Sequence, residues 1–158
     1  MRPIRPHRAD ELPLILQRAM ASAREQLSAR EVPLASPDRV ARQLQEMYRV
    51  VLATPGSALL VAEGWELPEP GPAGHLLLMP QASPFTGIRE VVVMDIWVHP
   101  GLRGRKIGSA LVEEAERYAR SISARGLVAQ IALHNQASLA LFARMGFGQE
   151  RVVAGKGL

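Results

Sequence analysis

One stretch of this sequence decides how the remainder is interpreted: residues 98–110 read VHPGLRGRKIGSA. An apolar run over residues 90–98 precedes it, and apolar residues recur at helical spacing after it, over residues 107–122. The stretch is therefore predicted to contain a strand end, a glycine-containing turn and the start of a helix. Because the first amides of a helix lack internal acceptors and lie at the positive end of its dipole, the turn is a predicted anion site.

The charges in this turn favour the same interpretation. Arg103, Arg105 and Lys106 lie where cations are unfavourable by about 0.3–1 kcal/mol each, and no acidic residue occurs between Asp95 and Glu113 to offset them. A bound anion would remove the conflict, whereas a solvated basic turn is the alternative. The turn has neither the Gly-Lys-Ser/Thr of a P-loop nor the G-x-G-x-x-G of a dinucleotide site, so a different phosphorylated ligand is indicated.

The sequence on either side of the turn predicts a mixed α/β fold. Strand, helix and strand over residues 91–133 form a βαβ unit, so its two strands should be parallel. The earlier strands are separated by Gly/Pro-rich loops and indicate an antiparallel meander. The predicted helices cover residues 10–27, 36–51, 107–122 and 135–145, and the predicted strands cover 58–62, 75–79, 90–98, 127–133 and 147–153. The last is expected to be an exposed edge strand, which makes a homodimer plausible.

Length and composition bound the class of protein. A chain of 158 residues suits one domain, and the absence of cysteine excludes disulfides, thiolate metal sites and a cysteine nucleophile. No apolar run approaches the ~18 residues of a membrane helix, and no secretory signal is evident at the start, so a cytoplasmic protein is expected. The net charge of +4 favours a polyanionic partner: nucleic acid, anionic lipid or a phosphorylated small molecule.

Two blocks of residues together resemble the GCN5-related N-acetyltransferase (GNAT) family. The strand end at residues 95–98, followed by Arg103-Gly104-Arg105-Lys106-Ile107-Gly108, looks like the family's acetyl-CoA-binding motif, Arg/Gln-x-x-Gly-x-Gly/Ala. The second block, residues 135–147, is similar to the family's Asn-x-x-Ala/Ser-x-x-Leu-Tyr-x-x-x-Gly-Phe. Both blocks occur in order and at the expected spacing, and the resemblance covers residues 91–147.

The resemblance implies one N-acetyltransferase domain over residues 1–158. Its sheet would be mixed and mostly antiparallel, with a central parallel strand pair that splays at a bulge and helices on both faces. Acetyl-CoA would be the co-substrate, without a metal; its pantetheine arm would pair with the opened strand and its pyrophosphate with the turn. The residues implied to contact it are Ile96, Trp97, Val98, Arg103, Gly104, Arg105, Lys106, Ile107, Gly108, Ser109, Asn135 and Phe142.

Two residues depart from the family's pattern. Lys106 replaces the motif's middle glycine, and its amide can still meet a pyrophosphate if its φ is helical. Phe142 replaces a tyrosine that is usually credited with protonating the departing thiolate, and phenylalanine cannot donate a proton. Because a thiol is already a fair leaving group, Phe142 should slow the chemistry without forbidding it. Ser138 or a water could supply the proton, and Phe142 could equally pack in the core.

Acyl transfer to an amine also needs a base, and several residues are candidates. Asp95, directly before the conserved strand end of the family motif, is the first choice, with pairing to a basic neighbour as its structural alternative. Glu90 and His99 follow, and both are also explained as strand-edge residues. His75 and His134 are further candidates, and His134 could be a buried core histidine.

The sequence therefore supports three functions in order. The first is transfer of an acetyl group from acetyl-CoA to a primary amine by direct attack, where the acceptor is a small molecule or a protein amine of unspecified identity. The second is a CoA-binding regulatory or partner module without catalysis, suggested by Phe142. The third, a nucleic-acid binder, is disfavoured because aromatic residues make up only 4% of the chain and no helix has a continuous basic face.

Overall fold

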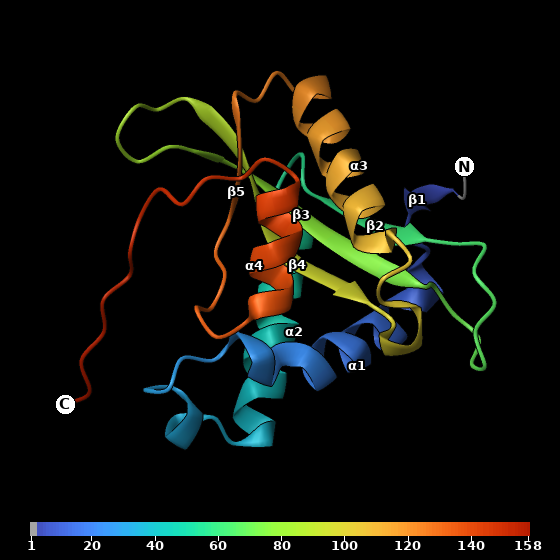
Figure 1. Ribbon diagram of the computed structural model, residues 1–158, viewed down its shortest axis with the longest axis horizontal. Coiled ribbons are helices and arrows are strands. Elements are labelled where there is room, and N and C mark those ends of the chain that lie inside the picture. The colour runs from blue at the N-terminus through green and yellow to red at the C-terminus, as the bar shows by residue number, and fades with distance from the viewer. Residues whose placement is uncertain (1–2) are drawn as a thin grey trace.

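The computed structural model describes residues 3–158, in which one sheet carries helices on both faces (Figure 1). Within these residues the sheet has five strands in the order β1-β2-β3-β4-β5; β4 and β5 are parallel, and all other neighbours are antiparallel. The strands are β1 (Ile4–Pro6), β2 (Ala58–Ala62), β3 (Gly74–Ala82), β4 (Arg89–Val98) and β5 (Gly126–Ala129). The helices are α1 (Leu12–Ser22), α2 (Pro37–Ala53), α3 (Ile107–Ser121) and α4 (Gln136–Arg144).

The two faces of the sheet have separate cores. Alternate strand residues such as Leu76 and Val91 pack with Ile107, Leu111 and Phe142 on the face covered by α3 and α4. The residues between them in sequence face α1 and α2, where Leu77 packs against Ile15 and Tyr48. The period of two along each strand therefore determines which helix pair each side chain contacts.

The structure confirms the mixed α/β class, the antiparallel meander and the parallel β4–β5 pair. The start of α2 also agrees with the sequence: Ser36 is its N-cap, and the Ser36 hydroxyl accepts a hydrogen bond from the Arg39 N–H at 3.3 Å. Pro37 occupies the first helical position, where its missing N–H costs nothing. Asn135, one of two predicted caps, begins α4.

Several predicted boundaries are wrong. The predicted helix over residues 10–27 is helical only to Ser22 and continues as a short 3-10 turn, and the strand predicted to end at residue 79 runs through Pro80 to Ala82. The strand predicted over residues 127–133 begins one residue earlier, at Gly126, and ends at Ala129. The predicted edge strand over residues 147–153 is absent: residues 147–158 form neither helix nor strand. The expectation of a homodimer thereby loses the strand on which it was based.

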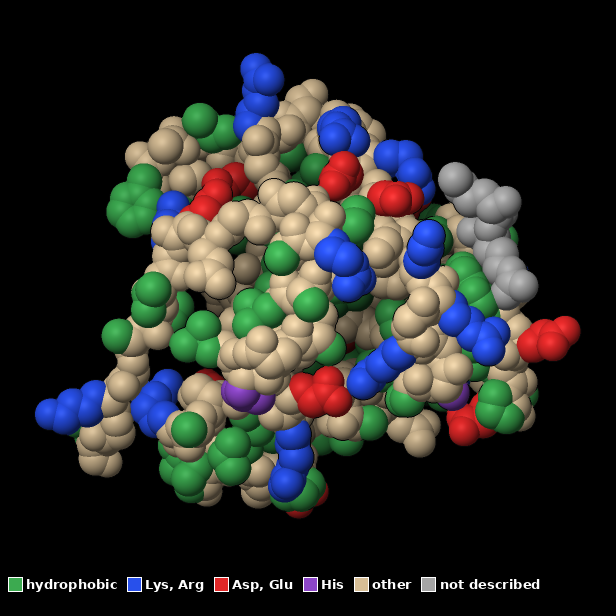
Figure 2. Space-filling view, viewed as in Figure 1, with side chains coloured by type: hydrophobic (Ala, Val, Ile, Leu, Met, Phe, Trp, Pro, Cys, Tyr) green, Lys and Arg blue, Asp and Glu red, His purple; other side chains and the backbone are tan. Residues whose placement is uncertain are grey.

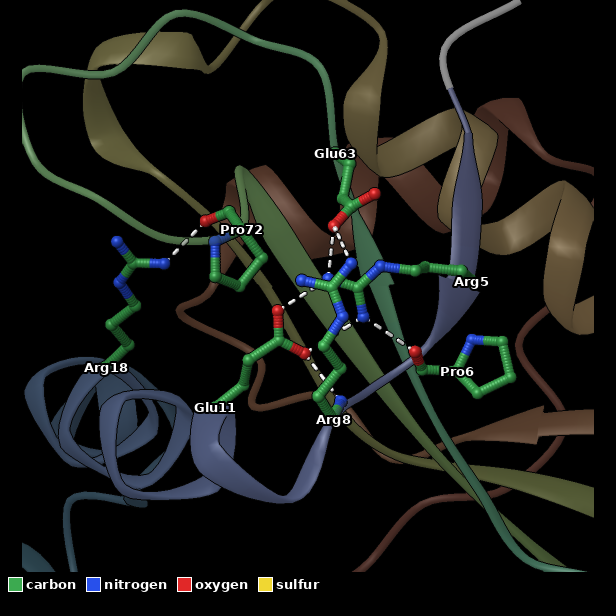
Figure 3. Close-up of polar contacts among 7 residues, drawn as sticks. All are labelled: Arg5, Pro6, Arg8, Glu11, Arg18, Glu63 and Pro72. Atoms are coloured by element: carbon green, nitrogen blue, oxygen red, sulfur yellow. Dashed lines mark hydrogen bonds and ion pairs between the residues drawn. The ribbon is translucent and has the colours of Figure 1, made fainter.

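Strand β1 was not predicted, and charged side chains hold it in place. Arg5 forms hydrogen bonds with Glu11, at 2.6 and 3.0 Å, and with Glu63, and Glu11 also accepts from the Arg8 N–H (Figure 3). The hydrogen bonds from Arg5 outweigh burial and lower the pKa of Glu11 to about 2. This cluster ties the first strand and the turn before α1 to the end of β2.

The C-terminal segment stands away from the body of the protein (Figures 1 and 2). Its side chains are exposed from residue 148 onward. On the face drawn in Figure 2, basic and acidic side chains are interspersed. None of the helices formed by residues 3–158 is both long enough and apolar enough to cross a membrane.

Gly74 permits the closest approach between the sheet and α3. A Cβ atom added at Gly74 would lie 2.7 Å from the Trp97 carbonyl oxygen and within 3.4 Å of Leu111 and Ile107 side-chain atoms. Because the first neighbour is backbone, the substitution requires the strand to move.

We therefore expect Gly74→Ala to lower the free energy of unfolding by about 1–3 kcal/mol, measured by urea denaturation. Gly148→Ala is the matched control, since a Cβ there meets nothing within 4 Å. Equal stability of the two variants would contradict the packing described.

Candidate functional site

A β-bulge in β4 is the main irregularity of the sheet. Opposite β3, Leu77 pairs with Asp95 while the next residue, Leu78, pairs with Val93, so Met94 is an extra residue in β4. The extra residue reverses the alternation of side chains beyond it. Val93 faces α3 and α4, whereas Met94 and Asp95 both face α1 and α2. The bulge therefore turns the Asp95 carboxylate toward α2.

The parallel pairing of β4 with β5 ends at this bulge. The last pair is Val93 with Ala129, yet β4 continues to Val98 while β5 stops. In Figure 1 the chain after β5 continues past the sheet before it turns back into α4. Residues 94–98 thus have no strand neighbour on the β5 side within residues 3–158. This is the splayed parallel pair that the resemblance implied.

The turn beyond β4 presents unpaired backbone amides. The Arg103 and Arg105 N–H groups donate to the carbonyls of Pro100 and Leu102, both at 3.3 Å, so these two amides are occupied. Among residues 3–158, the N–H groups of Gly104 and of residues 106–109 donate to no protein acceptor. No acidic residue lies in the first turn of α3. The unpaired amides of the turn therefore belong to Gly104 and residues 106–109, and their contact with an anion stays a prediction.

Lys106 departs from its expected backbone conformation. Its φ is +63°, in the left-handed region, and it precedes the helix as the N-cap of α3. The condition of a helical φ at Lys106 is therefore not met, and the turn has a conformation that a glycine adopts without strain. A side chain in this region costs roughly 1–2 kcal/mol. The lysine therefore occupies a position that glycine would fill without strain, and it adds a charge.

The second sequence block packs against the same end of α3. A Cβ at Gly108 would lie 3.0 Å from the Leu141 side chain, so the glycine lets α4 approach α3 closely. The Asn135 side chain accepts a hydrogen bond from the Ser138 N–H at 3.1 Å, which caps α4. Phe142 is buried and meets Phe147 edge-on at 4.8 Å. Phe142 thus packs in the core, the structural alternative given above.

The carboxylate of Asp95 is held by two buried side chains. Its Oδ2 atom accepts a hydrogen bond from the Tyr48 hydroxyl at 2.6 Å and lies 3.0 Å from the Nε2 atom of His75. Tyr48 and His75 are 1% and 0% exposed, whereas the Asp95 side chain is 15% exposed. Burial would raise the pKa of Asp95, but the hydrogen bonds from His75 and Tyr48 outweigh it and lower the pKa below its ordinary value.

Tyr48 is the member of this cluster that the sequence did not reveal. It occupies an apolar position in the helical stripe of α2, where a core role is the ordinary interpretation. Burial, together with the adjacent carboxylate, raises the pKa of Tyr48, so the hydroxyl remains a donor. Only the fold shows that this stripe packs beneath Asp95.

Of the other predicted bases, His75 lies within this cluster, whereas Glu90, His99 and His134 lie outside it. Glu90 pairs with Gly126 where β4 and β5 are still joined, about 16 Å along the strand from Asp95, and Gln81 is its side-chain partner at 3.5 Å. The Nδ1 atom of His99 accepts from the Gly101 N–H at 3.1 Å and caps a 3-10 turn. His134 is exposed, so the suggestion of a buried core histidine is wrong.

Trp97 forms one wall of a pocket of about 240 Å³ between α1 and the end of β4. Its ring is 7% exposed, stacks on His75 with centroids 5.7 Å apart, and is covered by the Arg18 guanidinium at 4.8 Å. Arg18 also donates to the Pro72 carbonyl (Figure 3). Glu25, Glu69 and Arg103 line the rest of the pocket, so its charges are mixed. The burial of Trp97 agrees with a packing role, and its contact with a cofactor stays a prediction.

Comparison with known proteins connects these features. A sequence model described as the acetyltransferase (GNAT) family matches residues 18–147. An uncharacterised N-acetyltransferase of Methanocaldococcus jannaschii, MJ1207, is 35% identical over 68 residues, which cover 42% of this chain and 30% of the relative. The aligned part of this chain spans about a third of the length of the curated relatives it matches.

Solved structures share the fold. A proposed acetyltransferase from Pyrococcus furiosus superposes with a TM-score of 0.81 at 19% identity, over 100% of both chains. The aminoglycoside acetyltransferase AAC(6')-Iy, solved with a bisubstrate analogue that contains CoA, has a TM-score of 0.66 at 16% identity, over 100% of this chain and 99% of the other. At these identities the likeness extends to the fold alone.

The conformation of Lys106 leads to a stability prediction. Lys106→Gly should be more stable than Lys106→Ala by about 1 kcal/mol, because both lose the charge and only glycine adopts φ +63° without strain. Thermal and urea unfolding of the two variants measure this difference. A Lys106→Ala variant as stable as Lys106→Gly would contradict the left-handed turn.

Proposed function

The chain belongs to the acetyltransferase (GNAT) family, and from that premise we propose that it transfers an acetyl group from acetyl-CoA to a primary amine. The observation that carries the proposal is the end of β4–β5 pairing at Val93 and Ala129, next to the unpaired amides of residues 106–109. An opened strand edge and an anion site adjoin each other, as an elongated ligand with a pyrophosphate requires. The CoA-containing analogue held by the related aminoglycoside enzyme supports the choice of ligand.

The residues of the turn fit a pyrophosphate in both geometry and charge. Four consecutive N–H groups at a helix start, with no acidic residue in the first turn of the helix, match an anion with several acceptor oxygens. The nearest acidic partner is Glu25, which lies 3.9 Å from Arg103. Arg103, Arg105 and Lys106 are exposed around them and supply the positive charge. In this proposal the pantetheine arm extends along the backbone of Ile96 and Val98, as an added strand would.

The proposed reaction is a direct acyl transfer. The neutral amine nitrogen attacks the thioester carbonyl carbon, a C–N bond forms, the C–S bond breaks and CoA leaves as the thiolate. A backbone N–H near Ile96 would stabilise the oxyanion of the tetrahedral intermediate. Asp95 is the proposed base for the amine proton, directly or through a water, because it is the partly exposed carboxylate beside the bulge.

Protonation of the thiolate has no strong candidate on α4. Phe142 has no acidic proton, so Ser138 or a water would supply it. Ser138 is partly buried in the first turn of α4, and its hydroxyl has no hydrogen-bond partner within residues 3–158. Asn135 caps the same helix and is proposed to contact the cofactor near the sulfur. A cytoplasmic location would suit an enzyme that consumes acetyl-CoA.

The occupied Oδ2 atom of Asp95 and the buried Phe142 favour one alternative, a CoA-binding regulatory module that performs no transfer. The two functions differ in thiol release. Incubation with acetyl-CoA and a panel of alkylamines, amino acids, aminoglycosides and peptides should yield free CoA with at least one amine. Measurable CoA affinity without thiol release across the panel would favour the regulatory module.

Isothermal titration tests the ligand itself. We expect the chain to bind acetyl-CoA and CoA, and Arg105→Gln to weaken both about tenfold, an effect that high salt should reduce. Arg117→Gln is the matched control, because Arg117 lies further along α3 and pairs with Glu114. Undetectable binding by the wild-type chain at high micromolar concentration would remove the proposal.

A further inference from the structure

The buried pair Tyr48 and His75 has no part in the reaction as proposed so far. Both side chains converge on a single atom, Oδ2 of Asp95, from different elements: Tyr48 from α2 and His75 from β3. Asp95 Oδ1 has no side-chain partner within residues 3–158. The Ile96 backbone N–H also donates to this carboxylate, and the Asp95 side chain remains 15% exposed.

The hydrogen bonds determine which ring nitrogen of His75 carries its proton. The single proton of the Tyr48 hydroxyl is donated to Asp95 at 2.6 Å, so its oxygen acts as an acceptor toward His75 Nε2 at 3.2 Å. Asp95 Oδ2, 3.0 Å from the same Nε2 atom, is also an acceptor. Nε2 is therefore the donor, whereas Nδ1 is buried without a hydrogen-bond partner within residues 3–158.

The packing around His75 keeps this arrangement dry and fixed. The Trp97 ring stacks on the imidazole with an interplanar angle of 12°, and the Arg18 guanidinium covers the Trp97 ring. Tyr48 and His75 are the titratable groups that face Asp95. Arg18 from α1 and His99 at the end of β4 are separated from it, because both contact the Trp97 ring instead. No carboxylate shares the cluster within residues 3–158, so both contacts stabilise the ionised form of Asp95.

We propose that Tyr48 and His75 are positioning residues that hold Asp95 ionised, with its exposed part left to take the proton of the acceptor amine. The catalytic consequence of this inference rests on the proposed function. The ionised state of the Asp95 carboxylate rests on the geometry alone. An ionised carboxylate suits an acceptor that arrives as an alkylammonium ion. The carboxylate takes the ammonium proton, and the resulting neutral amine then attacks. The two donors thus extend the acidic end of the working pH range, because they keep the base unprotonated at lower pH.

The first test measures the carboxylate itself in the full chain without substrate. Carbon-13 NMR titration of Asp95 should place its midpoint below that of an ordinary aspartate, and Tyr48→Phe and His75→Leu should each move it upward. His75→Gln keeps an N–H donor and should restore part of the shift. Tyr118→Phe is the matched control, since Tyr118 lies on α3 and does not contact Asp95. An unchanged midpoint in folded Tyr48→Phe and His75→Leu would overturn the inference.

The second test uses the pH profile of kcat/KM. In Tyr48→Phe and His75→Leu, the acid limb of the profile should move to higher pH. At the acidic end of the profile, kcat/KM should fall about tenfold, while the affinity for acetyl-CoA is unchanged. His75→Gln should recover much of the loss. A loss that is uniform across pH would indicate a purely structural role and contradict the inference. If the wild-type chain transfers acetyl to no amine, the proposed function fails, whereas the NMR titration still decides the positioning role.

Discussion

The inserted residue in β4 is the constraint on which the rest of the site depends. With Met94 added opposite β3, the strand beyond it changes the faces of its side chains, and its pairing with β5 ends. Both consequences have one cause, because a bulge increases local twist and interrupts the ladder. Without the bulge, strict alternation would direct Asp95 into the apolar core under α3. With it, the carboxylate faces α2 and an open strand edge lies beside the first turn of α3.

The open edge and the helix start are complementary parts of one binding surface. The edge offers backbone groups to an extended arm, and the unpaired amides of residues 106–109 offer donors to an anion at its end. The anion also explains why basic side chains occupy the turn, because a bound anion relieves their repulsion by the positive end of the helix dipole. Lys106 fits the same account: its backbone is left-handed, a conformation that glycine would adopt without strain, and its side chain adds a positive charge. Phe142, by contrast, contributes packing rather than a proton.

The fold class and the turn before α3 could be predicted from the sequence, whereas the bulge and the partners of Asp95 could not. The turn at residues 98–110, the βαβ unit and the cap at Ser36 follow from local patterns with strong physical signals. The extra residue at Met94 leaves no such signal, because it depends on the register with β3. Tyr48 looks like any core aromatic until α2 is placed under Asp95. The predicted strand over residues 147–153 failed because its apolar residues have no neighbouring strand, and β1 was missed because three residues show no periodicity.

Amide hydrogen exchange with and without CoA tests most directly whether the bulge opens a ligand site. The account predicts slower exchange on CoA addition in two segments, residues 94–98 and residues 104–109, because both acquire an acceptor or are covered. Exchange in the β1–β2 region should not change. Protection confined to the pocket between α1 and Trp97, or to the exposed C-terminal segment, with residues 94–98 unaffected, would contradict the claim that the open edge of β4 receives the ligand.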